Sequence, residues 1–302
     1  MTARMLHEKP SPWLTLARVP LWLLLASMLM PYYWMFTGAF KTGTELIRKP
    51  PTYWVEEPTL KNFYDPGYAG DLSDADHWEG IFQVAVEGHG FMHFFANSLL
   101  VTVVVTVGSL LAGSFVAFVL CKRPFPGSGL LFNLLLLSMM VPWEVTIVPN
   151  FVTVARLGWI NSYAALLLPS LAKAFVVFYF RQVILSISND LIDAATMDGA
   201  GTVRIWWSVV LPLLRPGLAA IGIPVVVSEW NSFLWPLLVV NDAQFMTLPL
   251  ELGKMAGNLT YNPKSAAVLM AGSLLASLPA VVAFLFVQRQ FIEGLGAGAT
   301  KG

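Results

Sequence analysis

The stretch "GHGFMHFFANSLLVTVVVTVGSLLAGSFVAFVLC", from Gly88 to Cys121, decides the fold class because it contains no Asp, Glu, Lys or Arg. It exceeds the roughly 20 residues that a helix needs to cross the ~30 Å hydrocarbon core of a bilayer. Backbone polar groups in lipid must be hydrogen-bonded within their own segment. The stretch therefore predicts a transmembrane helix.

Five other runs have a similar length and composition. They are Val19–Phe40, Pro124–Trp143 and Ser265–Gln288 without any charge, Leu157–Phe180 with only Lys173, and Pro216–Asn241 with only Glu229. The chain is 12% charged, against about 25% for a typical soluble domain. We predict an all-α membrane protein with one transmembrane domain over residues 1–302 and six transmembrane helices, at about 15–40, 91–121, 128–150, 160–183, 214–240 and 265–289. No A-x-A site follows the first helix, so we expect it to be retained.

Lys and Arg residues indicate which loops face the cytoplasm. With a cytoplasmic N-terminus, the inside segments hold Arg4, Lys9, Arg18, Lys122, Arg123, Arg181, Arg204, Arg215, Arg289 and Lys301. Most of the outside cations then fall in the loop 41–90, together with nine acidic residues. We predict that both termini are cytoplasmic, that 41–90 is an extracytoplasmic loop with little regular structure, and that the loop 188–212 between helices four and five is cytoplasmic.

Composition and motifs exclude several functions. The net charge is zero, which argues against nucleic-acid binding. His89 and His93, with Asp74, Asp76 and His77 upstream, lack a fixed third ligand, so we assign no metal site. No G-x-x-x-x-G-K-[ST], G-x-S-x-G or H-E-x-x-H motif is present. We therefore assign no catalytic residue and no cofactor to this chain.

The loop "SNDLIDAATMDGAGTVRIWW", Ser188 to Trp207, is unusual in so apolar a chain. Asp190 is predicted to cap a short helix, with Asp193 as a weak capping-box partner. Gly199 and Gly201 are expected to end this helix. Its middle, "AATM", is small and apolar, whereas a helix free in water has a polar face. This pattern indicates that another protein docks there closely.

This loop resembles the EAA loop of permease subunits in ABC importers. The family pattern is E-A-A-x-x-x-G, nine residues, then I-x-L-P, and here "DAATMDG" is followed after nine residues by "VVLP". Asp193 departs from the usual Glu, which keeps the charge but shortens the reach. The resemblance implies that the loop is a coupling helix in a groove of an ATPase subunit. The coupling residues would be Asp193, Ala194, Ala195, Asp198, Gly199, Leu211 and Pro212.

The same resemblance implies the partners. ATP and Mg would bind to a separate pair of ATP-binding subunits, so this chain would not itself be an enzyme. We also expect a second permease subunit of different sequence, an extracytoplasmic sugar-binding protein and the lipid bilayer as partners. The location implied is the bacterial or archaeal cytoplasmic (inner) membrane, with a multi-pass chain.

Two further stretches are similar to sugar-importing permeases of the maltose/glycerol-phosphate type. They are "SEWNSFLWPLLVV" (Ser228–Val240) and the C-terminal "QRQFIEGLGAGATKG". A charge inside a span is costly unless it faces a cavity or a partner, and aromatic walls suit sugar rings. We therefore predict a substrate pathway, with packing or gating roles left open, at Glu229, Trp230, Asn231, Phe233 and Trp235. Pro224 and Pro236 are expected to interrupt backbone hydrogen bonds.

Other functions remain open at this point. An ABC permease for a non-sugar solute would keep the coupling loop, whereas an ion-coupled secondary transporter would not need it. An intramembrane enzyme would have to assemble Glu144, Lys173 and Glu229 from three spans. For Glu144 and Lys173, a buried ion pair or a subunit contact is as compatible with the sequence as a role in the pathway.

Overall fold

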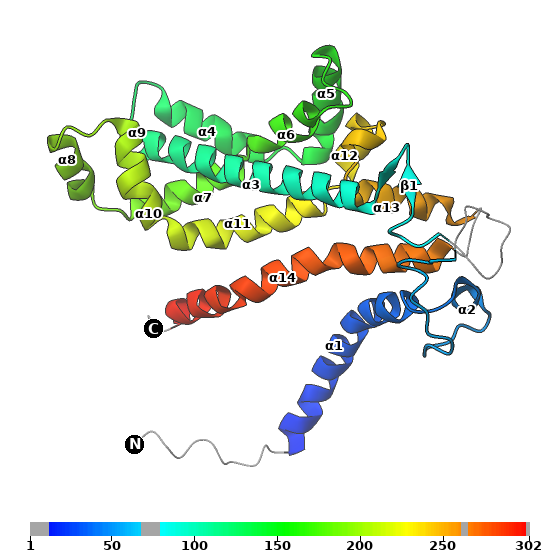
Figure 1. The fold of residues 1–302 in the computed structure, drawn as a ribbon. Coiled ribbons are helices and arrows are strands. Elements are labelled where there is room, and N and C mark those ends of the chain that lie inside the picture. Colours follow the sequence, from blue (N-terminus) through cyan, green and yellow to red (C-terminus); the bar gives the residue numbers. More distant parts are fainter. Residues whose placement is uncertain (1–11, 68–78, 261–264, 300–302) are drawn as a thin grey trace. The chain divides into compact units, whose positions relative to one another are not determined.

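The protein is mostly helical in the computed structural model, which describes residues 12–67, 79–260 and 265–299 (Figure 1). The helices are, in chain order, α1 (Pro12–Gly38), α2 (Gly43–Ile47), α3 (Phe91–Lys122), α4 (Ser128–Met139), α5 (Trp143–Arg156), α6 (Tyr163–Leu171), α7 (Ala174–Leu185), α8 (Asn189–Met197), α9 (Thr202–Ile205), α10 (Leu211–Leu213), α11 (Arg215–Trp230), α12 (Leu234–Val239), α13 (Leu248–Gly257) and α14 (Ser265–Ala299). A π-helical turn, η1 (Trp206–Val210), joins α9 to α10, and η2 (Ala243–Phe245) and η3 (Asn258–Thr260) are 3₁₀ turns. The prediction of a helical membrane protein is confirmed in this general form.

Several helices meet the length and composition needed to cross a membrane. Within the described residues, four do so singly: Arg18–Gly38, Phe91–Lys122, Tyr163–Leu185 and Ser265–Leu285. Two bent pairs, Ser128–Met139 with Trp143–Arg156 and Thr202–Leu213 with Arg215–Trp230, raise the total to six if each pair counts as one span. The six-span topology and the cytoplasmic termini stay predictions.

The described residues form two compact units. One comprises those within 1–83 and 255–275, and the other comprises those within 84–254 and 276–302. The second unit contains α3 to α12, most of α13 and the longer part of α14. It also contains a small antiparallel hairpin of β1 (Ala85–Val86) and β2 (His89–Gly90), in which Ala85 pairs with Gly90.

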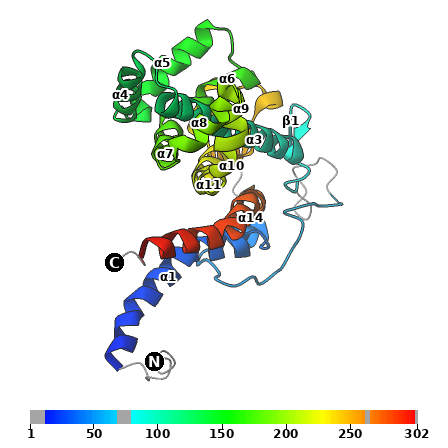
Figure 2. The same cartoon turned by 90° about the vertical axis from the view of Figure 1, so that its left-hand side faces the viewer.

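The second unit is built around α3, which runs along it beside α7, α6 and α11 (Figures 1 and 2). Small residues let α3 approach its neighbours closely, as is common in membrane proteins. A β-carbon on Gly113 would stand 2.7 Å from Cγ1 of Val176, and one on Gly108 would stand 2.5 Å from Cδ2 of Leu171. Glycine therefore allows the close approach of α3 to α6 at Gly108 and to α7 at Gly113.

Breaks divide three of the predicted spans. The predicted helix 128–150 ends at Met139 and resumes at Trp143 after a 107° bend, because Pro142 disfavours helix at the residue before it. The predicted helix 160–183 is broken at Ala172 and Lys173. The predicted helix 214–240 ends at Trp230 and resumes at Leu234.

Neither predicted proline ends its helix. Pro224 lacks the N–H that would bond to the preceding turn, but α11 continues through it. Pro236 is the third residue of α12, where the first-turn N–H groups have no partner within the helix. The interruption near the end of this span therefore comes from the segment 231–233 rather than from either proline.

In the first unit, the residues that follow α1 contain a buried network of polar side chains. The Glu45 carboxylate accepts hydrogen bonds from the Thr52 hydroxyl (2.9 Å) and the Glu56 N–H (3.0 Å). Burial raises the pKa of Glu45, but these donors, the Glu57 N–H and the Lys41 ammonium outweigh it, so the net pKa is lowered. Beyond α2, the described part of the segment 41–83 has no regular helix or strand.

Candidate functional site

The helix α8 begins differently from the sequence prediction. Its N-cap is Ser188, whose hydroxyl accepts a hydrogen bond from the Asp190 N–H (3.1 Å). Asp190 instead lies in the first turn, where its carboxylate accepts a hydrogen bond from Ser188 (3.0 Å). Asp190 as the N-cap, with Asp193 as its capping-box partner, is therefore wrong. The serine occupies the cap because a short hydroxyl reaches the second N–H of the helix.

The C-terminal end of α8 is closed by Gly199, as predicted, whereas Gly201, also expected to end this helix, is the N-cap of α9. The Ala200 N–H bonds to the Ala195 carbonyl (3.0 Å) and the Gly199 N–H bonds to the Thr196 carbonyl (3.0 Å). This pair of bonds is a Schellman motif, with Gly199 in the left-handed conformation at φ 78°. A β-carbon on Gly199 would meet nothing within 4 Å, so the chain itself leaves the space beside it open.

Most predicted coupling residues lie on the free surface of α8. Asp193, Ala194, Asp198 and Gly199 are exposed and Ala195 is half-buried. Ile192 points into the core and is 3% exposed. Apolar Met197, in contrast, is 89% exposed. This small, acidic and partly apolar face is therefore uncovered in the described structure.

Two basic residues at the end of α3 hold α8 in place. The Lys122 ammonium donates to the Ile187 carbonyl (2.6 Å) and to the Asn189 side chain (2.7 Å). The Arg123 guanidinium donates to the Thr196 hydroxyl. These hydrogen bonds connect α8 directly to α3, the central helix of the unit.

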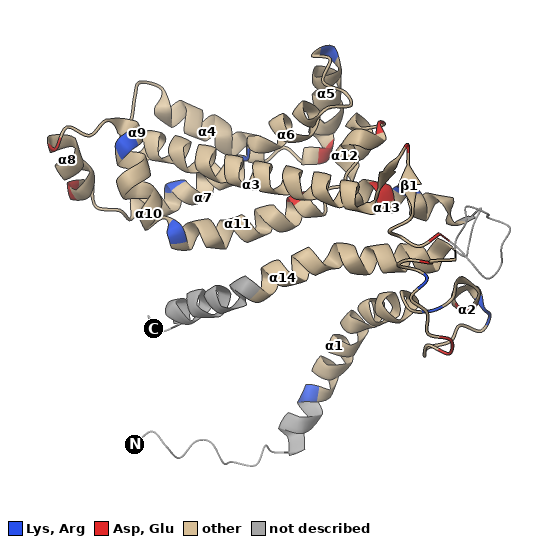
Figure 3. Ribbon diagram, in the orientation of Figure 1, with Lys and Arg blue, Asp and Glu red and all other residues tan. Residues whose placement is uncertain are grey.

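The segment after α8 anchors the loop in the core. Ile205 and Trp206 are buried, and the Trp206 indole N–H donates to the Ser114 hydroxyl on α3 (3.3 Å). Leu211 packs against the same core cluster, whereas Pro212 is exposed. The two ends of the predicted motif therefore differ, because Asp193 to Gly199 form a surface and Leu211 is largely an anchor. In Figure 3, acidic positions mark α8 and basic positions lie on α9 and where α10 meets α11.

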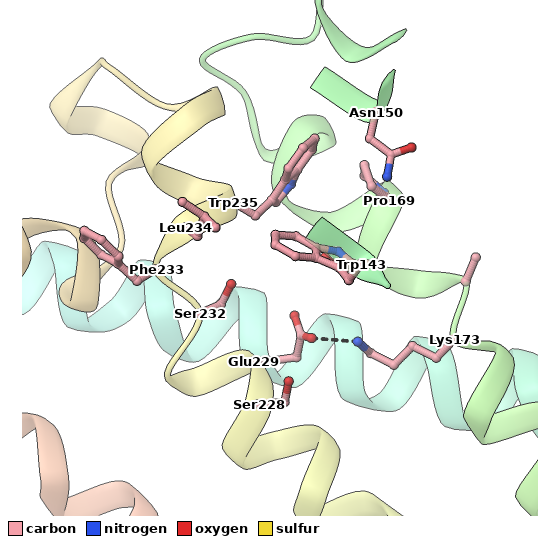
Figure 4. A pocket seen from close by; sticks show the side chains of 12 residues that line it. Trp143, Asn150, Pro169, Lys173, Ser228, Glu229, Ser232, Phe233, Leu234 and Trp235 are labelled. Atoms are coloured by element: carbon pink, nitrogen blue, oxygen red, sulfur yellow. Dashed lines mark hydrogen bonds and ion pairs between the residues drawn. The ribbon is translucent and has the colours of Figure 1, made fainter. Parts of the chain in front are cut away.

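A separate cavity of about 460 Å³ opens in the second unit where three helices are interrupted (Figure 4). Its walls come from the start of α5, the α6–α7 break and the α11–α12 break. The lining residues are Trp143, Asn150, Pro169, Ser170, Ala172, Lys173, Ser228, Glu229, Ser232, Phe233, Leu234 and Trp235. Its volume lies within the range of small-molecule sites, roughly 300–1,000 Å³.

An ion pair spans the floor of this cavity. The Lys173 ammonium lies 2.7 Å from the Glu229 carboxylate, and their side chains are 24% and 8% exposed. Lys173 is the N-cap of α7 and Glu229 is the penultimate residue of α11. Lys173 therefore forms an ion pair, which is one of the roles that the sequence left open for this residue. Glu144, in the first turn of α5, is exposed.

The five predicted pathway residues have different environments. Glu229 and Trp235 line the cavity, and the Trp235 N–H is fixed by the Ala165 carbonyl (2.9 Å). Phe233 also lines it, but its ring packs against Gly253 of α13. Trp230 does not line this cavity but lines a smaller one next to it. It is 4% exposed and donates to the Ala276 carbonyl (2.9 Å), which is a packing role.

One predicted pathway residue lies outside the cavity, and two residues that line the cavity were not predicted. Asn231 is exposed at the end of α11, where its amide donates to the Val227 carbonyl (2.8 Å), and it lines no described cavity. Trp143 and Asn150 line the cavity and were missed. The signal that would have found them is Pro142, which ends one helix and turns the next toward the cavity.

The two histidines considered for metal do not form a metal site with described residues. Their rings stack with centroids 4.2 Å apart, and His93 Nε2 is hydrogen-bonded to the Gln244 carbonyl (2.8 Å). No group of three potential ligands occurs among the described residues. Asp74, Asp76 and His77 lie outside them.

Comparison with known proteins gives the family. Residues 109–293 match the family described as "Binding-protein-dependent transport system inner membrane component". This match covers more than half of the 302 residues. The chain belongs to this family. The matched region begins within α3 and includes α8 and every cavity-lining residue.

Individual permease relatives agree with this placement. The chain is 34% identical over 268 residues to the arabinooligosaccharides transport system permease protein AraQ of Halalkalibacterium halodurans, covering 89% of each chain. It is 30% identical over 269 residues to the sn-glycerol-3-phosphate transport system permease protein UgpE of Brucella suis, covering 88% of this chain and 89% of that one.

A solved structure has the same fold. It is a chain of a bacterial ABC transporter involved in the import of the acidic polysaccharide alginate, with a TM-score of 0.75 and 21% identity. The likeness covers 94% of this chain and 98% of that one.

Family membership confirms the ABC-importer resemblance drawn from the loop at 193–212. As an importer permease, the chain is an integral membrane subunit rather than an enzyme. The family works with a second permease, an ATPase and a binding protein in general, and it is found in the inner membrane.

Proposed function

We propose that this permease forms half of the translocation pathway for a sugar or sugar derivative and is driven by a cytoplasmic ATPase docked on α8. The observation that carries the proposal is the free face of α8, which is capped at both ends and tied to the central helix. A rigid helix with small exposed residues allows a partner's backbone to approach closely. It also supplies Asp193 and Asp198 for basic groups of the partner.

The proposed mechanism transmits motion through α3. ATP and Mg bind to the ATPase pair, and closure of that pair displaces the docked α8. Lys122 and Arg123 pass this displacement to α3, which continues for 32 residues without a break. The opposite half of α3 contributes Ser98 and Val101 to a small cavity that shares Ser170, Glu229, Ser232 and Trp235 with the larger one. ATP shifts the equilibrium between inward- and outward-open states only through its different affinity for them.

The solute class is supported by the cavity and by the relatives. Indole rings, hydroxyls and an amide line the cavity, a combination that suits the apolar faces and polar edges of sugars. The permease relatives are named for arabinooligosaccharides and for sn-glycerol-3-phosphate.

The proposed assembly contains a second permease of different sequence, an ATP-binding dimer and an extracytoplasmic sugar-binding protein, in a bacterial or archaeal cytoplasmic membrane. Both termini and α8 would face the cytoplasm, and the loop 41–90 would face outward.

Co-purification tests the docking of α8. The tagged chain is expressed with its natural neighbours and extracted in mild detergent as wild type and as Gly199→Asp. An unpaired charge in an interface costs about 3 kcal/mol, a loss of roughly 100-fold in affinity. We expect the ATPase to accompany the wild type and to be absent from the variant, while the second permease remains.

Two controls isolate the cause. Gly158→Asp adds the same charge at another positive-φ glycine (φ 70°) with open surroundings, and it should retain the ATPase. Gly199→Asn tolerates the same backbone conformation without the charge and should retain most of it. Retention of the ATPase by Gly199→Asp would refute docking at this position. If ATP depletion then left uptake intact while an ion gradient lasted, the function would be ion-coupled transport.

A further inference from the structure

The charge balance of the cavity points to the kind of sugar that it accepts. Among the twelve residues that line it, Lys173 is the one cation and Glu229 the one anion. We propose that this subsite selects uncharged sugars over sugar phosphates and uronates, because Glu229 neutralises the only cation available to an anionic ligand. The inference rests on the proposed sugar pathway and specifies its solute class.

The Lys173–Glu229 pair is held by the backbone on both sides. The carbonyl of Lys173 accepts hydrogen bonds from the N–H groups of Val176 (3.1 Å) and Val177 (3.4 Å) in α7. Glu229 lies in the last turn of α11, and its carbonyl accepts the Ser232 N–H (3.1 Å). Both side chains therefore start from fixed positions and meet at 2.7 Å.

An anionic sugar would have to compete with Glu229. A carboxylate or phosphate is stabilised in proteins by Arg, Lys or several N–H donors, and Lys173 already gives one of its protons to a carboxylate that is only 8% exposed. Placing a second anion beside Glu229 adds like-charge repulsion in a partly desolvated site. The paired cavity thus rejects anions although it contains a lysine.

An uncharged sugar meets no such competition. The hydroxyls of Ser228 and Ser232 lie beside Glu229 (Figure 4), and Asn150 and Ser170 also line the cavity. These groups match the donors and acceptors of sugar hydroxyls. The Trp143 side chain, 46% exposed, lies over the cavity beside Trp235. Its indole face provides an apolar surface for a pyranose or furanose ring.

Relatives do not decide this point, because the two permeases named above are labelled for an uncharged oligosaccharide and for a phosphate ester. The charge within the cavity itself is therefore the feature to vary.

A charge series tests the proposal. The complete importer is assembled in nanodiscs without its binding protein, and equilibrium dialysis measures the binding of labelled maltose, cellobiose and arabinobiose against glucose 6-phosphate, glycerol 3-phosphate and digalacturonate. Four forms are compared: wild type, Glu229→Gln, Lys173→Gln and the double variant. Co-purification of the partner subunits verifies that each form is assembled.

The wild type should bind at least one uncharged sugar and favour it over the anionic ligands by about tenfold or more. Glu229→Gln, which frees the cation, should raise the anionic-to-uncharged ratio by about tenfold. Lys173→Gln should lower that ratio below the wild-type value. The double variant carries no charge in the cavity and should return the ratio toward the wild type.

Two results would overturn the inference. One is a wild-type protein that binds the anionic ligands as tightly as the uncharged ones. The other is an anionic-to-uncharged binding ratio that stays the same in all four forms. If no form binds any sugar in the panel while the ATPase remains attached, the proposed sugar pathway fails instead, and with it this inference. The two failures are therefore distinguishable.

Discussion

The helix α8 and the cavity differ in how far apart in the sequence their residues lie. The exposed face of α8 comes from one stretch, Asp193 to Gly199. The cavity takes its walls from residues 143–150, 169–173 and 228–235. A surface built from consecutive residues is determined by helix periodicity and capping. A cavity is determined by where distant helices break and pack.

The two regions also differ in what their residues already contact. The predicted face of α8 is largely exposed, so a substitution there disturbs few contacts within the chain. Side chains around the cavity are tied to the chain itself, as Trp235 is to Ala165 and Lys173 is to Glu229. A substitution there changes the fold and the ligand site together, and experiments must separate the two.

The largest effect is expected from Ala195→Arg. A long cation on this half-buried position would keep the ATPase away from α8, and uptake should fall by about 100-fold or more. Uptake into proteoliposomes and co-purification of the ATPase measure the effect. Ala256→Arg, on an exposed position of α13, is the matched control. If Ala195→Arg showed wild-type uptake, the proposed difference between the exposed face of α8 and the cavity would be contradicted.

Trp230→Ala and Trp143→Ala sharpen the distinction between packing and lining. Truncating the buried Trp230 should lower the free energy of unfolding by about 3–5 kcal/mol. Truncating Trp143, which is 46% exposed, should cost less than about 1 kcal/mol but reduce sugar binding. Thermal unfolding in detergent and equilibrium dialysis provide the two readouts. A loss of sugar binding at unchanged stability in Trp230→Ala would show that our packing assignment is wrong.

A smaller effect is expected at the link between the regions. Lys122→Met removes two hydrogen bonds from the α3–α8 connection, a loss of about 1 kcal/mol or roughly fivefold in coupling. The ATPase should remain attached, but transported sugar per ATP hydrolysed should fall. Lys122→Arg, which retains donors, should recover part of the yield. An unchanged sugar-to-ATP ratio in Lys122→Met would contradict transmission through this contact.

The smallest effect is expected from Asn231→Ala. Its amide bonds to the Val227 carbonyl in its own helix and lines no described cavity, so uptake should change by less than about twofold. Initial uptake rates of wild type and variant, normalised to the amount of assembled transporter, measure this. A tenfold lower uptake rate per assembled transporter would contradict this expectation and return Asn231 to the substrate pathway.

Local features were accessible from the sequence because their causes lie within a few residues. The charge-free run at Gly88–Cys121 predicts the central helix, which the structure places at Phe91–Lys122. Gly199 predicts the end of α8, since its positive φ suits glycine. The N-cap was misassigned because Ser188 and Asp190 are both good caps, and only the backbone geometry chooses between them.

The sequence by itself determined that this chain is a helical membrane protein with an EAA-type loop, because hydropathy and the spacing of small and acidic residues are properties of one segment. Only the tertiary structure decided that Lys173 meets Glu229, that Trp143 lines the cavity and that Trp230 packs against the backbone of α14. These contacts join residues that are far apart in the chain. Their geometry depends on the bend after Met139, the break at Ala172 and the close packing of α3 against α6 at Gly108 and against α7 at Gly113.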